Sequence, residues 1–177
     1  MTRAGSGCVV RLALQDFARC ANIWDVAGQP ELVARLVSEL AAGDRITLVY
    51  ARDGAYLGEG SVVLRHDDPD YTIPGRRVYL SRLVVKRECR NQGIGGTILD
   101  ALIAYADAAG YDEMVVAVDV DNYVARHLYE KKGFTTVLRH ARDAQGEYVK
   151  LLRMRPRCDR GGHPQDSDGG TPRGEES

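Results

Sequence analysis

A glycine-rich turn in the middle of the chain has the residue types needed to bind phosphate. Gly93, Gly95 and Gly96 follow the apolar run at residues 83–85 and open a helical pattern. Successive backbone N–H groups at a helix N-terminus point the same way, and the helix dipole adds partial positive charge there. Glycines let phosphate oxygens approach this backbone without a Cβ in the way. The turn therefore predicts a site for a pyrophosphate or a similar anion.

Two common nucleotide-binding motifs do not fit this turn. A P-loop ends in Gly-Lys-Ser/Thr, whereas Gly96 is followed directly by Thr97. A dinucleotide-binding fold places its glycines after the first strand and an acidic residue on a following strand, and this chain has neither arrangement. Arg90 adds a permanent cation beside the turn. Taken alone, the glycines indicate an anion site or simply a tight helix–strand turn.

A second motif lies between Asn122 and Phe134. Asn122 is a favourable N-cap for a helix that carries Ala125, Leu128 and Tyr129 on one face. The Tyr129 hydroxyl has the chemistry of a general acid, although a core aromatic at a helix end is the structural alternative.

These two motifs, in this order, resemble the cofactor site of the GNAT superfamily of N-acetyltransferases. The resemblance is close from about residue 79 to 134 and follows element order over about residues 8–154. It is carried by Arg90-x-x-Gly93-x-Gly95 and by Asn122-x-x-Ala125-x-x-Leu128-Tyr129-Glu130-Lys131-Lys132-Gly133-Phe134. It implies an acyltransferase that moves the acetyl group of acetyl-CoA to a primary amine by direct attack in a ternary complex.

The resemblance also implies roles for individual residues. The strand at 83–85 pairs with the pantetheine arm, the turn holds the pyrophosphate, and Asn122 hydrogen-bonds the arm. Tyr129 stands near the thioester sulfur as the catalytic acid, and a backbone N–H, that of Val85, polarises the carbonyl. The expected cofactor-binding residues are Leu83, Val84, Val85, Arg90, Asn91, Gln92, Gly93, Ile94, Gly95, Gly96, Thr97, Asn122 and Tyr129.

The general base is open at this point. Many relatives place an acid on the strand before the turn, where this chain has Ser81 and Arg82. Glu59, between two glycines, is the first candidate as a catalytic base. Asp119, Asp121 or a chain of waters are the alternatives.

The histidines and cysteines predict no metal site. His66, His127 and His140 are scattered, and the four cysteines contain no C-x-x-C pair. Cys89, beside Arg90, is a weaker candidate nucleophile for an acyl-enzyme route.

Hydrophobic periodicity supplies the elements that position these residues. Strands are expected at 8–14, 46–51, 56–65, 77–85, 114–120, 134–139 and 148–154, and helices at 15–24, 30–42, 93–109 and 122–132. This order predicts a mixed α/β (α+β) fold of the GNAT type, with a mostly antiparallel central sheet and helices on both faces. We expect one domain at residues 1–156 and a disordered tail at 157–177, which has no aliphatic residue.

The acceptor amine should be selected by the helix at 30–42, the loop at 67–76 and the final hairpin. Asp67, Asp68 and Asp70 make this loop acidic; an acidic rim would favour a cationic acceptor, while a solvated loop is the simpler interpretation. We expect a small-molecule amine. A protein α-amine or lysine, or an acyl-CoA-binding module without turnover, are the alternatives.

Bulk composition excludes other classes of function. The net charge is −1, with 24 basic against 25 acidic residues, so no basic field favours nucleic acid. No run approaches the roughly 20 apolar residues of a membrane span. A cytoplasmic protein is expected, and the family resemblance suggests a homodimer.

Overall fold

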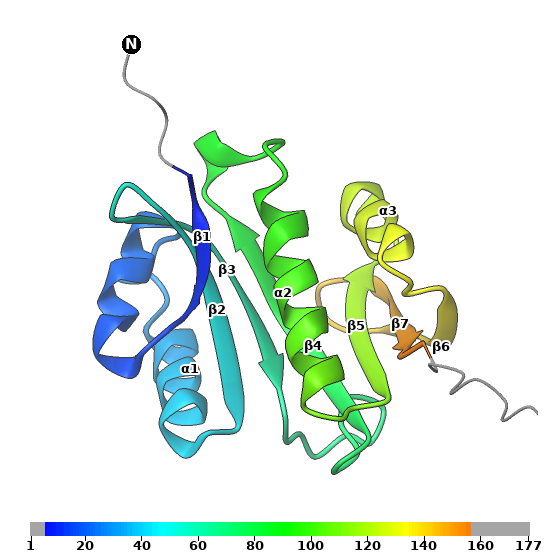
Figure 1. Cartoon of the computed structure of the whole chain (residues 1–177). Coiled ribbons are helices and arrows are strands. Elements are labelled where there is room, and N and C mark those ends of the chain that lie inside the picture. Colours follow the sequence, from blue (N-terminus) through cyan, green and yellow to red (C-terminus); the bar gives the residue numbers. More distant parts are fainter. Residues whose placement is uncertain (1–5, 157–177) are drawn as a thin grey trace, which may run out of the picture.

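The central feature of the fold is one mixed sheet. The structure, a computed structural model, describes residues 6–156. Within them, seven strands pair in the order β1-β2-β3-β4-β5-β7-β6, and only the β4–β5 pair is parallel. The predicted mixed, mostly antiparallel sheet with helices on both faces is confirmed (Figure 1). The tail expected at 157–177 lies outside the described residues.

The predicted elements are present with bounds shifted by a few residues. The strands are β1 (Cys8–Arg11), β2 (Arg45–Arg52), β3 (Ala55–Val63), β4 (Arg77–Val85), β5 (Glu113–Asp119), β6 (Thr136–Arg142) and β7 (Glu147–Met154). The helices are η1 (Leu14–Asn22), α1 (Pro30–Ala42), η2 (Arg87–Cys89), α2 (Ile94–Ala108) and α3 (Tyr123–Lys131). The single turn η2 was not predicted, because three residues carry no readable periodicity.

Helices on the two faces of the sheet enclose separate hydrophobic cores. One core joins the sheet to α2 and α3 through side chains such as Ile98, Leu102 and Tyr129. The other joins it to η1 and α1 through Phe17, Cys20 and Leu36. Figure 1 shows α2 lying across the middle of the sheet, in front. Gly58 and Gly60 allow this close approach, because a Cβ at either would lie within 3.0 Å of Ile98.

Strands β4 and β5 separate halfway along the sheet. They pair only from Arg77 to Leu80 on β4 and from Glu113 to Val116 on β5. Glu113 stabilises the paired end, because its buried carboxylate lies 2.7 Å from Arg76 Nη2 and 2.6 Å from Arg77 Nη2. Beyond this point β4 pairs only with β3, and β5 pairs only with β7. The edge of β4 that faces β5 is therefore left without a partner.

A β-bulge in β4 changes which side chains face each core. Ser61 pairs with Arg82 and the next residue of β3, Val62, pairs with Leu80, so Ser81 has no partner. Leu80 and Leu83 therefore both face α2 although they are three positions apart, an odd spacing that would put them on opposite faces of a regular strand.

Candidate active site

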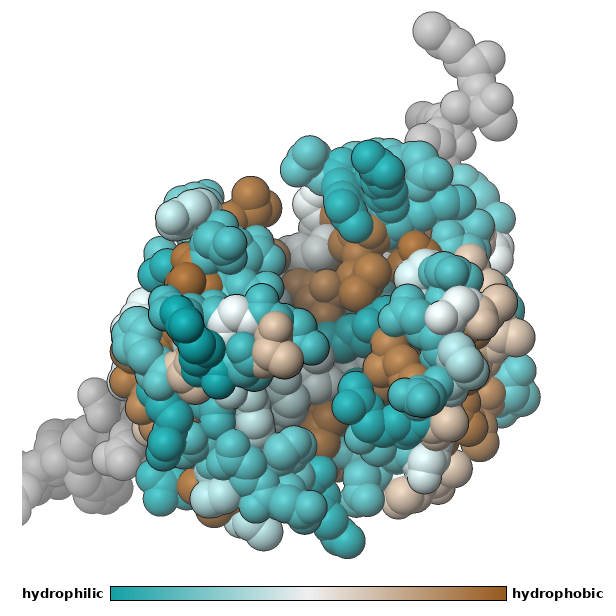
Figure 2. All heavy atoms as spheres, turned by 180° about the vertical axis from the view of Figure 1, so that it is seen from behind, coloured by the Kyte–Doolittle hydropathy of each residue, from teal (hydrophilic) through white to brown (hydrophobic). Residues whose placement is uncertain are grey.

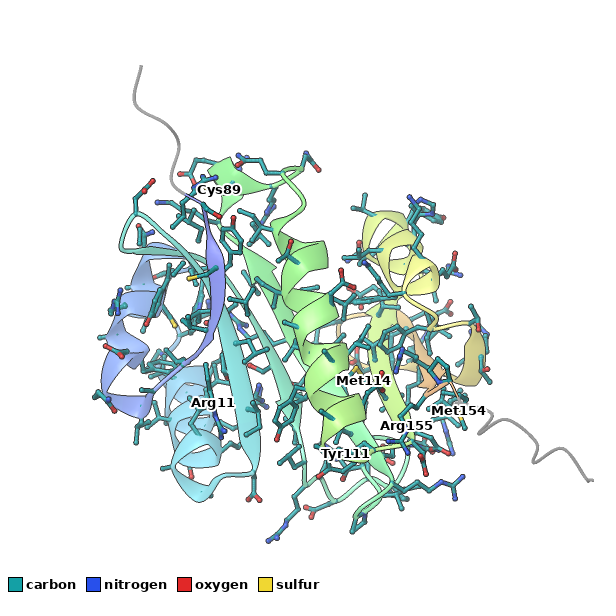
Figure 3. All side chains as sticks on the ribbon, viewed as in Figure 1. Arg11, Cys89, Tyr111, Met114, Met154 and Arg155 are labelled. Atoms are coloured by element: carbon teal, nitrogen blue, oxygen red, sulfur yellow. The ribbon has the colours of Figure 1, made fainter. Side chains whose placement is uncertain are left out.

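A cavity of about 660 Å³ opens where β4 leaves β5. This volume lies within the roughly 300–1,000 Å³ range of small-molecule sites. It is lined by the end of β4, the following turn, the first turn of α2, and α3: Leu83, Val84, Val85, Cys89, Arg90, Asn91, Gly93, Ile94, Gly95, Gly96, Asn122, Val124, Ala125, Leu128 and Tyr129. Cys89 lies at the end of the cavity that the turn forms. Figure 3 shows Cys89 near the N-terminal end of α2, opposite Tyr111 at the other end of the helix.

The turn before α2 presents a cradle of backbone donors. Asn91 and Gly93 adopt left-handed conformations, with φ of 60° and 79°, and these bend the chain into the helix. The first helical bond runs from the N–H of Thr97 to the oxygen of Gly93, at 3.0 Å. The N–H groups of residues 91–96 donate to no atom of the described chain. Unpaired donors at a helix N-terminus form an anion site.

Gly95 and Gly96 keep this cradle open toward α3. A Cβ at Gly95 would lie 3.6 Å from Val85 Cγ2, and one at Gly96 would lie 4.0 Å from Leu128 Cδ1. Both added atoms fit beside the protein but would occupy space that lines the cavity. The cradle therefore fits a phosphate-bearing ligand, because its oxygens can reach the backbone only where side chains are absent.

The open edge of β4 provides hydrogen-bonding groups at the centre of the cavity. The N–H of Lys86 donates to Leu57 of β3 at 2.8 Å. Because successive N–H groups of a strand point to opposite edges, the N–H of Val85 points away from β3, toward the gap left by β5. The oxygen of Val85 points the same way and accepts from Arg90 Nε at 3.2 Å. An extended ligand arm can pair with this edge as an additional strand.

Helix α3 brings Tyr129 to the far wall of the cavity. Asn122 caps the helix by accepting from the N–H of Ala125 at 3.2 Å, as predicted. Tyr129 is 8% exposed and packs edge-to-face on Phe134, with ring centroids 5.7 Å apart. Burial, and next the neighbouring Tyr79, raise the pKa of Tyr129 to about 12. Its hydroxyl is thus neutral near pH 7 and retains a proton to donate.

Most of the predicted cofactor-binding residues line this one cavity. Two do not: Gln92 Nε2 donates to the oxygen of Glu88 at 3.4 Å, and Thr97 Oγ1 donates to the oxygen of Gly93 at 3.0 Å. The predicted set lacks four residues that line the cavity: Cys89, Val124, Ala125 and Leu128. Val124 is an exposed apolar residue in the first turn of α3, and an apolar position beside an N-cap is the signal that could have identified it.

Glu59, the candidate base, is not brought to this cavity. It pairs with Val84 across β3 and β4 and is only 2% exposed. Its carboxylate accepts from Arg82 Nε at 2.5 Å, and the guanidinium of Arg82 also stacks on Trp24 at 4.4 Å. Burial, and next the carboxylate of Glu59, raise the pKa of the neighbouring Cys20 thiol. Among the alternative bases, Asp119 and Asp121 are exposed and do not line the cavity.

Asp68 and Asp70 of the acidic loop do not form the predicted open negative rim, because both carboxylates are paired with basic side chains, whereas Asp67 is exposed. Lys150 Nζ lies 2.8 Å from Asp68 and 3.1 Å from Asp70. Arg139 binds Asp70 as well, at 2.6 Å. The sequence separation of some 80 residues hid this neutralisation. Over residues 6–156 there is no cluster of metal-binding side chains and no helix long and apolar enough to cross a membrane.

Comparisons with known proteins agree with this geometry. The chain is 40% identical over 58 residues to GCN5-related N-acetyltransferase 7, chloroplastic, of Arabidopsis thaliana. That match covers 33% of this chain and 21% of the relative, so the chain spans about a fifth of the relative's length.

Two solved structures share the fold. An aminoglycoside 6'-N-acetyltransferase in complex with coenzyme A superimposes with a TM-score of 0.67 at 16% identity, covering 86% of this chain and 99% of that one. The ribosomal-protein-S18-alanine N-acetyltransferase of Escherichia coli gives 0.65 at 14% identity, covering 89% and 99%.

A sequence model of the acetyltransferase (GNAT) family matches residues 11–134, which is more than half of the chain. The resemblance predicted from the glycine turn and the Asn122–Phe134 motif is thereby confirmed, as is the assignment as an acyltransferase. Acetyl-CoA as acyl donor is confirmed with it. The chain therefore belongs to the acetyltransferase (GNAT) family.

Proposed function

We propose that the protein transfers the acetyl group of acetyl-CoA to the primary amine of a small molecule, by direct attack within a ternary complex. One observation carries the proposal: the Tyr129 side chain, the open edge at Val85 and the donor cradle at 91–96 line the same cavity. An acid, a carbonyl-polarising donor and a phosphate site are the parts that such a transfer needs.

Each end of the donor has a place along this cavity. The pyrophosphate is held by the N–H groups of residues 91–96, with Arg90 as a nearby cation. The pantetheine arm pairs with the β4 edge at Leu83 and Val85, and Asn122 Nδ2 is free to bind it, because Asn122 Oδ1 serves as the helix cap. The thioester then lies between Val85 and Tyr129.

Acetyl-CoA supplies an activated thioester, and the protein lowers the barrier to its aminolysis. The acceptor nitrogen bonds to the carbonyl carbon while the carbon–sulfur bond breaks. The Val85 N–H donates to the carbonyl oxygen as charge develops on it. Tyr129 gives its proton to the departing thiolate and recovers a proton from the amine through solvent.

The role of Glu59 as the general base stays a prediction. Because Glu59 is buried outside the cavity, a chain of waters would have to carry the proton from the amine to its carboxylate. If Glu59 takes this proton, Glu59→Gln lowers kcat and removes the rising limb of the rate-against-pH profile. If Glu59 only anchors Arg82, the profile keeps its shape and the loss appears in the free energy of unfolding. Both quantities are measured on the same variant.

The shape and size of the second cavity favour a small-molecule acceptor. The face opposite α2 is hollowed at its centre, with an apolar floor and a polar rim (Figure 2). A second cavity, between α1 and β4, measures about 260 Å³, which suits a compact amine. The protein-acceptor alternative and the binding-module alternative are decided by the assay. Cytoplasmic placement and dimerisation stay predictions.

The deciding experiment measures thiol release from acetyl-CoA with a panel of small amines and N-terminal or lysine peptides. Turnover of small amines supports the proposal; turnover of peptides alone replaces it with the protein-acceptor function. Absence of release with every amine, in protein that binds coenzyme A, indicates a binding module.

A pair of tyrosine variants tests the chemical step. Tyr129→Phe should lower kcat by about 10²–10³-fold, the effect of losing a general acid, while the KM for acetyl-CoA stays within about twofold. Tyr123→Phe is the matched control, since Tyr123 lies on the same helix and is 73% exposed. Full activity of Tyr129→Phe at every pH would remove Tyr129 from the mechanism.

A further inference from the structure

The smaller cavity, between α1 and β4, has an unusual concentration of arginine. We call it the arginine pocket. Its walls come from α1, the start of β2, the loop after β3, and β4: Leu32, Arg35, Leu36, Glu39, Arg45, Val63, His66, Tyr71, Tyr79, Ser81 and Arg82. None of these residues lines the acetyl-CoA cavity. The arginine pocket is therefore a separate cavity from the acetyl-CoA cavity.

Charges in the arginine pocket do not balance. Arg45 Nε lies 2.6 Å from Glu39, and Arg82 Nε lies 2.5 Å from Glu59. These pairs neutralise two of the three guanidinium groups. Arg35 forms no ion pair or hydrogen bond with any residue between 6 and 156, and it is exposed on the pocket wall. The pocket keeps one uncompensated positive charge that a ligand can meet.

Arg45 adds a buried donor that the protein leaves partly unused. The side chain is 4% exposed, and burying an arginine is costly unless its donors are satisfied. Its Nε binds Glu39 and its Nη1 donates to Ser81 Oγ at 2.7 Å. Its Nη2 donates to no atom of residues 6–156. The Nη2 atom is not fully buried either, so it keeps some contact with solvent. It is thus accessible for hydrogen bonding to a ligand. Carboxylate oxygens suit such a guanidinium.

Three aromatic rings form one wall of the arginine pocket. Tyr71 and Tyr79 stack with centroids 4.3 Å apart, and His66 meets Tyr71 edge-on at 4.8 Å. Lys150 stabilises this wall by a cation–π contact, with its ammonium 4.0 Å from the centroid of the Tyr71 ring. Strand β4 lines both cavities, with Tyr79, Ser81 and Arg82 on the arginine pocket and Leu83, Val84 and Val85 on the acetyl-CoA cavity. A ligand in the arginine pocket therefore lies against the same strand that provides the proposed thioester-binding edge.

We propose that the arginine pocket binds the carboxylate of the acceptor, so that the acceptor is an amine of about amino-acid size that also carries a carboxylate. This proposal rests on the proposed acetyl transfer to a small amine. Arg35 and Arg45 Nη2 hold the carboxylate, and the amine lies on the β4 side of the pocket, toward the thioester. A polyamine is disfavoured, because the pocket charge repels it and Asp68 and Asp70 are already paired with Lys150 and Arg139.

The test compares acceptors that differ only in the carboxylate. Thiol release is measured with phenylalanine, phenylalaninamide and phenethylamine, and with leucine, leucinamide and isopentylamine. We expect kcat/KM to be at least tenfold higher for the free acids. The amides carry the less basic amine, which is easier to deprotonate, so amine reactivity cannot produce this preference.

A variant then assigns the preference to the pocket. Arg35→Ala should raise the KM for the free acid by about tenfold or more and bring the acid-to-amide ratio close to one, with the KM for acetyl-CoA unchanged. Arg65→Ala is the matched control, because Arg65 is 82% exposed and lies outside the pocket. A preference for amides or polyamines, or an unchanged ratio in Arg35→Ala, overturns the acceptor class and leaves acetyl transfer standing.

Failure of the acetyl transfer itself gives a different result. If no amine releases thiol, the coenzyme A complex is titrated by calorimetry with N-acetylphenylalanine and with its amide. Binding of the acid that Arg35→Ala abolishes supports the carboxylate site without any turnover. Equal affinity for acid and amide, or no binding of either, overturns it.

Discussion

Gly96→Ala should affect folding and ligand binding in opposite directions. Gly96 lies in the first turn of α2, and its nearest neighbour beyond the helix is Leu128 Cδ1, 4.0 Å from where a Cβ would be. The added methyl group therefore makes an ordinary contact and strains nothing. Replacing glycine by alanine within a helix raises the free energy of unfolding by about 0.5–1 kcal/mol. We expect a stabilised protein.

The same methyl group obstructs the donor cradle. A phosphate bound at residues 91–96 accepts charge-assisted hydrogen bonds that contribute about 1.5–3 kcal/mol each. Displacing the phosphate from one of them lowers affinity by about 10- to 150-fold, since 1.4 kcal/mol corresponds to a factor of ten. Because the methyl group lies at the phosphate end of the cavity, kcat at saturating acetyl-CoA should change little.

Two measurements on each variant separate these effects. Calorimetric titration with coenzyme A gives the dissociation constant, and urea unfolding of the ligand-free protein gives stability. Ala104→Gly is the control, because Ala104 is an exposed position of α2 outside the cavity. It should lose about 0.5–1 kcal/mol of stability and bind coenzyme A as the wild type does.

Either of two outcomes would refute the reasoning. A stabilised Gly96→Ala that binds coenzyme A within twofold of the wild type shows that the phosphates do not reach this backbone. A Gly96→Ala that is clearly destabilised shows that residue 96 is not helical with open space beside it.

Three further predictions concern the cavity and its supports. Burial raises the pKa of Tyr129 from 10.0 to about 12, so the folded state favours the neutral phenol. The folding free energy that this preference contributes is complete below pH 10 and is lost as the pH rises toward 12. Urea unfolding should show the wild type losing stability relative to Tyr129→Phe only across that window, and a constant difference would contradict the burial argument. Glu113→Ala should lower the free energy of unfolding by about 3–5 kcal/mol, because it leaves the buried Arg77 unpaired. Glu147→Ala, in the exposed pair with Arg142, should cost less than about 1 kcal/mol, and equal losses would deny Glu113 its role at the β4–β5 junction. In a Cys8→Ser/Cys158→Ser variant, acetyl-CoA, which has no free thiol to consume the reagent, should slow alkylation of Cys89, which lines the cavity, as followed by mass spectrometry. Cys20, buried and with a raised thiol pKa, should stay unmodified with or without the ligand.

The local motifs of the cofactor site were readable from the chain because each is a short continuous segment. Gly93 with φ of 79°, the helix that follows it and the cap at Asn122 all depend on neighbours within a few residues. Periodicity placed Pro30–Ala42 and Arg77–Val85 at the observed bounds. The bounds of β1 and β6 were less accurate, because both are edge strands whose exposed faces carry a weaker pattern.

Side-chain partners distant in the sequence were not readable. The sequence offered Glu59 as the first candidate base but did not show its partner; the bulge at Ser81 and the alternation of β3 place its carboxylate against Arg82. Asp68 and Asp70 looked available to a cation, but Lys150, some 80 residues away, takes up both. Ion pairs of this kind depend on which strands become neighbours, and a single sequence contains no direct record of that.

The sequence by itself therefore determined the donor cradle to which we assign the pyrophosphate, because such a cradle is built from consecutive backbone groups and the glycines that expose them. Only the tertiary structure decided what lies on the acceptor side. The arginine pocket combines Arg35 of α1, Arg45 of β2 and Arg82 of β4, and their net charge depends on which carboxylates the fold places beside them. Electrostatic balance is a property of distances in space, and it appears only after the sheet and helices have packed.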